Sequence, residues 1–286
     1  MIPDYLKPEQ LKAFISTALA EDIGRGDYST IAAVPEAKTG SARLLIKDDG
    51  ILAGVTLAQK IFQFYDPQLQ ISVNKIDGDR IMKGDIAFQV TGRIRSILTT
   101  ERLILNCMQR MSGIATHTAR LVRQLKGTNA QVLDTRKTTP NFRAMEKWAV
   151  AIGGGQNHRF ALCDLVMLKD NHIDACGGIT KAITQSRKYL AENGLNLQIE
   201  VETRNLEEVE EALNSQPDII LLDNMSADEM KQAVQLVNGK CKTEASGGIT
   251  EKTIRSIAET GVDFISVGSL THTIKSLDMS LKILKE

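Results

Sequence analysis

A repeated strand-helix unit constrains the fold of this chain more than any other feature. Beyond residue 129, short apolar runs alternate with amphipathic helical stretches, and Glu202, Asp223, Ser246 and Gly268 end successive runs at intervals of 21, 23 and 22 residues. The runs are AQVLDT, LVMLKD, LQIEVET, DIILLDN, KTEASGG and FISVGS. Their apolar, β-branched character is typical of parallel strands buried on both faces. The period favours a (β/α) barrel, incomplete because the strands are too few to close it, and a doubly wound open sheet is the alternative.

The chain before this repeat predicts a separate α+β region. Residues 8–21 have helical spacing with Pro8 at the first turn, and residues 99–124 form a long helical pattern. Between them, the segments SARLLIKDDG, QLQISVNKI and IAFQVTGRIRSI alternate apolar and polar residues as half-buried strands do, around a helical segment at 55–65.

Composition excludes several classes of protein. Lys plus Arg and Asp plus Glu both number 35, so no overall charge attracts nucleic acid or an anionic membrane, and no stretch approaches 18 apolar residues. The four cysteines include no CxxC pair, which argues against a zinc site and a disulfide framework. The N-terminal residues lack the apolar segment of a signal peptide, so we expect a soluble, cytoplasmic protein.

Basic residues gather where the first strands end, although the whole chain is neutral. They are Arg136, Lys137, His158, Arg159 and Lys169. One interpretation is a pocket for a polyanionic ligand, because Arg recognises carboxylates with two parallel hydrogen bonds. The other is a structural network of ion pairs with Asp134, Asp164 and Asp170.

The later strand ends carry acids and glycines. Glu202 and Asp223 suit Mg²⁺ with a phosphate-bearing substrate, or ribose hydroxyls, unless they are ordinary polar residues of the barrel. The turns in ASGGIT and SVGSLTH can expose backbone N–H groups beside helix N-termini and so hold a phosphate, or they are only tight turns.

The segment IGGGQNHRFAL, residues 152–162, places three glycines before His158 and Arg159. Such a triplet is either a mobile linker or a place where the backbone approaches a ligand closely. Because the basic residues follow directly, we expect a binding loop over the ligand.

At this point the motifs identify a family. The chain resembles quinolinate phosphoribosyltransferase, also called carboxylating nicotinate-nucleotide pyrophosphorylase, almost from end to end. The shared motifs, in order, are EDIGRGD, TERLILNCMQRMSGIAT, DTRKTTP, EKWAV, GGGQNHR, MLKDNH, EVET, LLDNM, EASGGI and ISVGSLTH.

The resemblance implies a fold and an assembly. It implies an α/β fold with an N-terminal α/β sandwich-like domain at residues 1–112 and an incomplete α/β barrel at 113–286, whose last helix, 276–286, could pack on either domain. It also implies a homodimer in which Arg102 serves the partner's site. Spacing alone gives Arg102 no such role, and its alternative is a surface arginine paired with Glu101.

The resemblance also assigns roles to residues. Lys137, Lys169, Glu202 and Asp223 would be catalytic. Lys137, Glu202 and Asp223 would face phosphoribosyl pyrophosphate and its Mg²⁺, which Glu202 and Asp223 would hold directly or indirectly. Quinolinate would be bound by Arg136, His158, Arg159 and Lys169. The remaining substrate contacts would come from Thr135, Ser246, Gly247, Gly248, Val267, Gly268, Ser269 and His272.

One departure from the family pattern is Asn141, which stands after Pro140 where the family usually has Gly. Asn tolerates positive φ better than most residues, so we expect the turn to persist.

Three other functions remain open. The first is a homologue with another substrate, either nicotinate or one linked to molybdenum transport, although a monocarboxylate would leave part of the basic cluster unpaired. The second is a phosphosugar lyase or isomerase with Lys137 or Lys169 as a Schiff base. The third is a phosphate-binding regulator without catalysis.

Overall fold

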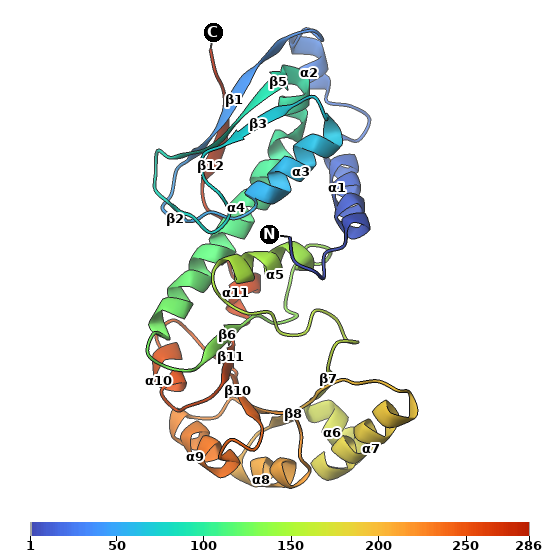
Figure 1. Ribbon diagram of the computed structural model, residues 1–286, viewed down its shortest axis with the longest axis vertical. Coiled ribbons are helices and arrows are strands. Elements are labelled where there is room, and N and C mark those ends of the chain that lie inside the picture. The colour runs from blue at the N-terminus through green and yellow to red at the C-terminus, as the bar shows by residue number, and fades with distance from the viewer. Residues whose placement is uncertain (1, 286) are drawn as a thin grey trace. The chain divides into compact units, whose positions relative to one another are not determined.

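The structure is a computed structural model that describes residues 2–285, and the chain divides into two compact units (Figure 1). The first unit takes in the chain up to Ala119, Thr138–Gly154 and the chain from Leu270 onward, and the second comprises Arg120–Lys137 and Gly155–Ser269. The chain therefore passes between the units several times, and the boundary expected at 112/113 stays a prediction. No helix within residues 2–285 has the length and hydropathy to cross a membrane.

The first unit contains an antiparallel sheet of order β12-β1-β5-β3. Its strands are β1 (Thr39–Ile46), β3 (Gln70–Val73), β5 (Ile86–Arg93) and β12 (Met279–Ile283), and β2 (Gly50–Ile51) pairs with β4 (Arg80–Ile81). Its helices are α1 (Pro8–Ile23), α2 (Tyr28–Ala33), α3 (Val55–Tyr65), most of α4 (Ile94–Gln124), α5 (Arg143–Ile152) and most of α11 (Ser269–His272).

This unit has an apolar core between α3 and the sheet. Phe62 of α3 and Phe88 of β5 are buried, and their rings meet edge to face with centroids 6.0 Å apart. The α+β organisation expected for residues 40–95 is confirmed, and α4 begins at Ile94 rather than near Thr99.

The helix expected at residues 276–286 is wrong, because Met279–Ile283 is the edge strand β12. Its register against β1 runs from Ala42 opposite Ile283 to Ile46 opposite Met279. Met279 and Leu281 are buried while Lys282 is exposed, which is the period of two that a strand requires.

The second unit is a parallel sheet of order β6-β11-β10-β9-β8-β7, which confirms the incomplete barrel. Its strands are β6 (Gln131–Leu133), β7 (Val166–Leu168), β8 (Ile199–Thr203), β9 (Ile219–Asp223), β10 (Lys242–Ser246) and β11 (Phe264–Ser266). Its helices are α6 (Asp170–Cys176), α7 (Ile179–Glu192), α8 (Leu206–Asn214), α9 (Ala227–Val237) and α10 (Ile254–Ala258). Figure 1 shows α7, α8 and α9 outside the curved sheet.

Local signals set the helix starts in this unit. The Ser226 hydroxyl caps the N-terminus of α9, and Glu229 completes a reciprocal capping box, while the Asn205 side chain accepts a hydrogen bond from the Glu208 N–H at the start of α8. Each helix therefore begins a few residues after its strand, which leaves short loops at the carboxyl edge of the sheet.

Candidate active site

The carboxyl ends of the parallel strands bring residues from distant parts of the sequence to one edge of the sheet. Ser246 at the end of β10 is in register with Asp223 at the end of β9, and Glu202 of β8 is in register with Leu221. A cavity of about 290 Å³ lies within this unit. It is lined by Asp134, Thr135, Arg136, Lys137, His158, Arg159, Met167, Lys169, Leu221, Glu244, Ser246 and Ser266.

The five basic residues expected to form a cluster all line this cavity. Lys137 and Lys169 are exposed, so their charged ends reach solvent or a ligand without a desolvation cost. The backbone N–H of Lys137 donates to the Thr135 hydroxyl at 3.0 Å, which shapes the turn that follows β6.

Two guanidinium groups stand close together in the cavity wall. Burial lowers the pKa of the Arg159 guanidinium, and the positive charge of Arg136 lowers it further. The Arg136 Nε atom is buried and has no hydrogen-bond partner among the described residues. Arg159 is held at one point, where Nη1 donates to the Leu165 carbonyl oxygen at 3.3 Å. Like charges side by side, with a spare donor, are the arrangement of a site that awaits an anion.

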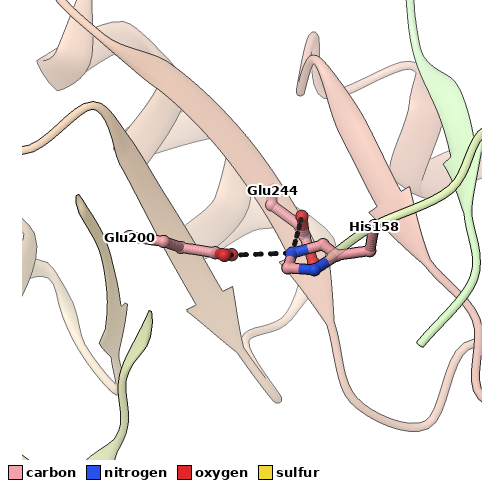
Figure 2. A group of neighbouring side chains, drawn as sticks. All are labelled: His158, Glu200 and Glu244. Carbon is pink, nitrogen blue, oxygen red and sulfur yellow. Dashed lines mark ion pairs between the residues drawn. The ribbon is translucent and has the colours of Figure 1, made fainter. Parts of the chain in front are cut away.

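Behind the arginines, His158 points at two buried carboxylates (Figure 2). Its Nε2 atom lies 3.0 Å from Glu200 Oε2 and 3.4 Å from Glu244 Oε2. The side chains of His158, Glu200 and Glu244 are 10%, 0% and 1% exposed. The two acids come from β8 and β10, which flank β9, and so the three residues tie the sheet to the loop before β7.

The protonation of this group follows from its hydrogen bonds. Burial by itself lowers the pKa of the His158 imidazole, but the hydrogen bonds to Glu200 and Glu244 outweigh it and raise the pKa to about 10. An imidazolium would need a proton on Nδ1, yet Nδ1 accepts the Arg159 backbone N–H at 2.8 Å. This hydrogen bond uses the Nδ1 lone pair, so in this geometry the ring carries its proton on Nε2 alone. A second proton on the ring would have to displace the Arg159 N–H. Burial raises the pKa of the Glu200 carboxyl, and the hydrogen bond from His158 opposes that rise.

The loop that carries His158 and Arg159 is anchored to β6. Gln156 N donates to Val132 O at 2.8 Å, and the fully buried Asp134 carboxylate accepts from His158 N at 2.9 Å and Asn157 Nδ2 at 2.6 Å. Asp134 therefore serves the backbone and amide of this loop. The other acid, Asp164, accepts the N–H groups of Phe160 and Ala161, both at 2.8 Å.

The three glycines before this loop serve packing as well. Gly153 ends α5, and a Cβ there would lie 2.5 Å from the Ala115 carbonyl oxygen of α4, so only glycine allows this approach. Gly153 is therefore tightly packed, unlike a residue of a mobile linker, whereas Gly154 is exposed and Gly155 half-buried. His158 and Arg159 do line the cavity as expected, whereas contact of the glycines with a ligand stays a prediction.

The acidic pair lies at the ends of β8 and β9. Burial raises the pKa of the Glu202 carboxyl, the negative charge of Asp223 raises it further, and Lys169 lowers it. Asp223 also accepts a hydrogen bond from Asn224 Nδ2 at 2.7 Å. The two carboxylates repel each other, which favours a cation between or beside them.

The glycine-rich turns follow β10 and β11. Gly247 has φ of +93°, and a Cβ there would collide with the Asn224 side chain, so the turn after Ser246 requires glycine. Val267 is buried, and its N–H donates to Leu133 O at 3.0 Å, so its part in binding would be to shape the turn. Gly268 and Ser269 are half-buried, whereas Gly248 is exposed.

Two predicted site residues belong to the first unit. Arg102 lies on α4 and is exposed. His272, also exposed, ends α11, and its Nδ1 is 2.6 Å from the Thr273 hydroxyl. Asn141 in this unit has φ of 61°, which confirms a turn that needs positive φ after Pro140.

The sequence interpretation missed Glu200 and Glu244, together with the cavity residues Met167, Leu221 and Ser266. A signal for the acids was present, because Glu200 is two residues before Glu202 and Glu244 two before Ser246. Alternate residues of a strand face the same side, so both acids had to point where the predicted site residues point.

Comparisons with known proteins agree with this architecture. Residues 27–112 match the quinolinate phosphoribosyl transferase N-terminal domain, and residues 114–282 match the C-terminal domain of the same name. The chain is 46% identical to nicotinate-nucleotide pyrophosphorylase [carboxylating], chloroplastic, of Arabidopsis thaliana over 289 residues, covering 96% of this chain and 82% of that protein. It is 41% identical to the probable nicotinate-nucleotide pyrophosphorylase [carboxylating] of Bacillus subtilis (strain 168) over 274 residues, covering 96% and 93%.

A solved structure gives the same result at the level of the fold. The crystal structure of NadC from Streptococcus pyogenes superposes with a TM-score of 0.92 at 43% identity, covering 98% of this chain and 99% of that one. The chain belongs to the quinolinate phosphoribosyl transferase family.

Proposed function

We propose that this protein transfers the phosphoribosyl group of phosphoribosyl pyrophosphate to quinolinate, with loss of CO₂, and so forms nicotinate mononucleotide and pyrophosphate for NAD biosynthesis. It would be a carboxylating nicotinate-nucleotide diphosphorylase, a pentosyltransferase. Relatives that match over most of their length carry the corresponding names. The alternative substrates and the lyase and regulator interpretations become outcomes of the test below.

One observation carries the choice of substrate, namely the guanidinium groups of Arg136 and Arg159 side by side in the cavity wall. Lys137 and Lys169 add two cations to the same cavity. Quinolinate brings two adjacent carboxylates, enough to pair both arginines, and nicotinate brings only one. Met167 and Leu221 give the cavity an apolar part suited to the flat pyridine ring.

In the transfer step the pyridine nitrogen attacks C1 of the ribose while pyrophosphate leaves. The developing positive charge on the sugar favours nearby carboxylates, a role that suits Glu202 and Asp223. Lys137 and Lys169 would hold anionic oxygens of the substrates, and Ser246, Gly247 and Gly248 with Val267, Gly268 and Ser269 would hold the 5'-phosphate through backbone N–H groups.

In the second step the substituted ring loses its 2-carboxylate. The electron pair left on C2 is stabilised by the adjacent positive nitrogen, CO₂ departs, and a proton then adds to C2. The protein needs to fix and desolvate the dianion rather than supply a strong base. Arg136 and Arg159 are placed to do this, with Thr135 at the same strand end.

Mg²⁺ is the cofactor that the acidic pair suits. Glu202 and Asp223 offer hard oxygen donors, and their mutual repulsion raises the pKa of Glu202. Bound with the pyrophosphate, the ion would neutralise charge on the leaving group. The side chains would contact it directly or through its water molecules.

We further propose a homodimer, or a larger assembly of such dimers, in which Arg102 contributes to the partner's site. Its exposure on α4 leaves it available for such a contact. His272 would complete the phosphate end of the site.

Subunit exchange tests the shared site. Arg102→Ala and Lys137→Ala chains, each expected to be nearly inactive alone, should recover about a quarter of wild-type activity when mixed and randomly paired. If Arg102 serves its own chain, verified exchange restores nothing.

We place the enzyme in the cytoplasm. The four cysteines, Cys107, Cys163, Cys176 and Cys241, are all free, as expected in a reducing compartment. Fluorescence from a tagged chain would test this location.

The reaction itself is tested by release of CO₂ from carboxyl-labelled quinolinate with phosphoribosyl pyrophosphate and Mg²⁺. We expect turnover with quinolinate and almost none with nicotinate in a matched pyrophosphate-release assay. A preference for nicotinate would overturn the choice of substrate, and borohydride trapping of a phosphosugar would indicate the lyase instead.

A further inference from the structure

The two buried carboxylates that face His158, those of Glu200 and Glu244, have no role in the chemistry described above. Two carboxylates face one imidazole nitrogen at 3.0 and 3.4 Å (Figure 2), and Glu200 Oε1 is buried without a hydrogen bond among the described residues. Burying acids in a barrel is costly, and apolar side chains of similar volume are often as stable or more so. Stability alone therefore gives no reason for this arrangement.

The group is linked to the cavity through Arg159. The Nδ1 atom of His158 accepts the Arg159 backbone N–H at 2.8 Å, and Asp134 holds the His158 N–H at 2.9 Å. The Nδ1 hydrogen bond, together with the approach of Nε2 to Glu200 and Glu244, fixes both ring nitrogens. The imidazole in turn fixes the Arg159 backbone, from which the Arg159 side chain extends.

The group is also linked to Arg159 by charge. Two carboxylates outnumber the one basic side chain between them, so the group is anionic, and the charge of Glu200 attracts the Arg159 guanidinium and raises its pKa. Arg136 pushes in the opposite sense, because its charge repels Arg159. Without a fixed anion behind it, Arg159 would turn away from Arg136 whenever the cavity holds no anionic ligand.

We propose that Glu200 and Glu244 are positioning residues that act through His158 to hold Arg159 beside Arg136, so that the receptor for two carboxylates is already assembled in the free enzyme. The proposal rests on the proposed function, since it names how that same site is preorganised. Preorganisation of this kind lowers the cost of binding the dianion and leaves the later chemical steps untouched.

The same three residues have the composition of a metal site, since their ligand atoms lie within 4.8 Å of one another. The hydrogen bond to Nδ1 and the approach of Nε2 to Glu200 at 3.0 Å explain the geometry with a proton alone. Metal analysis of the purified enzyme therefore forms part of the test.

The test is a set of variants that keep the shape of the acids, Glu200→Gln and Glu244→Gln. Each amide can still accept the His158 Nε2–H but lacks the negative charge. We expect KM for quinolinate to rise about tenfold or more, with kcat and KM for phosphoribosyl pyrophosphate changed less than about threefold. Asp263→Asn is the matched control, since Asp263 pairs with Lys242 and bonds Thr243 in the same sheet, and it should lower stability without changing KM for quinolinate.

A double-variant cycle separates positioning from general damage. If the acids act through Arg159, Glu200→Gln should add almost nothing to KM for quinolinate in an Arg159→Met background, and Glu244→Gln should behave alike. Independent, multiplicative effects would overturn the proposal, as would a stoichiometric metal ion bound to wild type and lost in both variants. If a variant folds poorly, calorimetry can measure the affinity of its folded fraction for quinolinate. These affinities then replace KM in the double-variant cycle. If wild type turns over quinolinate normally but the variant effects are independent, the positioning role alone is wrong. If wild type does not turn over quinolinate, the proposed function is wrong.

Discussion

Asp66 in the first unit and the cavity arginines in the second unit show two opposite ways of placing charged groups. In the first unit, Asp66 accepts hydrogen bonds from Arg93 Nε at 2.8 Å, Ser96 Oγ at 2.7 Å and Gln68 N at 3.1 Å. In the second unit, Arg136 and Arg159 line the same cavity, the charge of Arg136 lowers the pKa of Arg159, and the Arg136 Nε atom is unpaired among the described residues.

The ion pair between α4 and α5 is also completed by hydrogen bonds, as Asp66 is. Arg110 Nε donates to the fully buried Glu146 at 2.7 Å, and Arg110 Nη2 also donates to Thr139 Oγ1 at 3.0 Å and Thr271 O at 2.8 Å. Complete pairing offsets the cost of burial and so serves the fold. Incomplete pairing and like charges leave that cost in place until a ligand supplies the missing partner. Incomplete pairing thus marks the cavity arginines, whereas the buried Asp134 in the same unit is hydrogen-bonded to His158 N and Asn157 Nδ2 as a structural acid.

The largest effect on stability is expected at Arg110. Arg110→Met leaves the buried Glu146 carboxylate without its partner, and we expect a loss of about 3–5 kcal/mol in the free energy of unfolding. Urea denaturation followed by circular dichroism measures it. If Arg110→Met is as stable as wild type, complete pairing in the first unit has no structural value and the comparison fails.

A change at Arg159 should instead impair catalysis and leave the stability of the fold almost unchanged. Arg159→Met removes one carboxylate partner, so we expect kcat/KM for quinolinate to fall about a hundredfold, equivalent to about 3 kcal/mol, with the urea midpoint nearly unchanged. Steady-state kinetics on the same preparations measures this. Arg204→Met is the control, because Arg204 is exposed, does not line the cavity and pairs with Glu208 of α8. Equal kinetic losses in both variants would show that the effect is not specific to the cavity.

Asp66 gives a smaller effect that depends on pH. Its hydrogen bond from Arg93 holds the pKa of the Asp66 carboxyl at about 2, below the ordinary value of 3.8. The stabilisation is therefore present above pH 3.8 and is lost as the pH falls through about 2. We expect Asp66→Asn to cost about 2 kcal/mol at neutral pH, and the difference from wild type to shrink between those two pH values.

Denaturation of both proteins across that range checks the sign. A difference that stays constant or grows toward acid pH contradicts the assignment. Asp278→Asn, which removes an exposed partner of Lys47, should change stability by less than about 0.5 kcal/mol throughout.

The sequence predicts the parallel sheet well for a physical reason. Most strands from β6 to β11 are short apolar runs that end in polar or glycine residues, and β10 (Lys242–Ser246), which is mostly polar, keeps the same period, so strands and site edge follow from one pattern. The basic cluster at Arg136 and Arg159 is predicted by the same logic, because strand ends of a barrel meet.

Other features are hidden from such reasoning. Glu200 and Glu244 sit inside strands, where an acid reads as a break in the apolar run, and their pairing with His158 depends on which strands become neighbours. The residues of β12 predict a helix because Lys and Leu favour helices, although Leu277, Met279, Leu281 and Ile283 alternate with polar residues as a strand requires. Its pairing with β1 joins residues more than two hundred positions apart, which no local pattern records.

The central claim is that the paired guanidinium groups are a receptor for two carboxylates, and the thermal midpoint of Arg136→Met with and without quinolinate tests it most directly. The variant removes a buried unpaired donor and the repulsion on Arg159, so the ligand-free midpoint should equal or exceed that of wild type. Quinolinate at a hundredfold excess over Kd should stabilise wild type by about 2.7 kcal/mol and so clearly raise its thermal midpoint. The same concentration should leave the midpoint of Arg136→Met almost unchanged. A ligand-free variant that melts several degrees lower, yet is still stabilised by quinolinate as wild type is, would contradict the account.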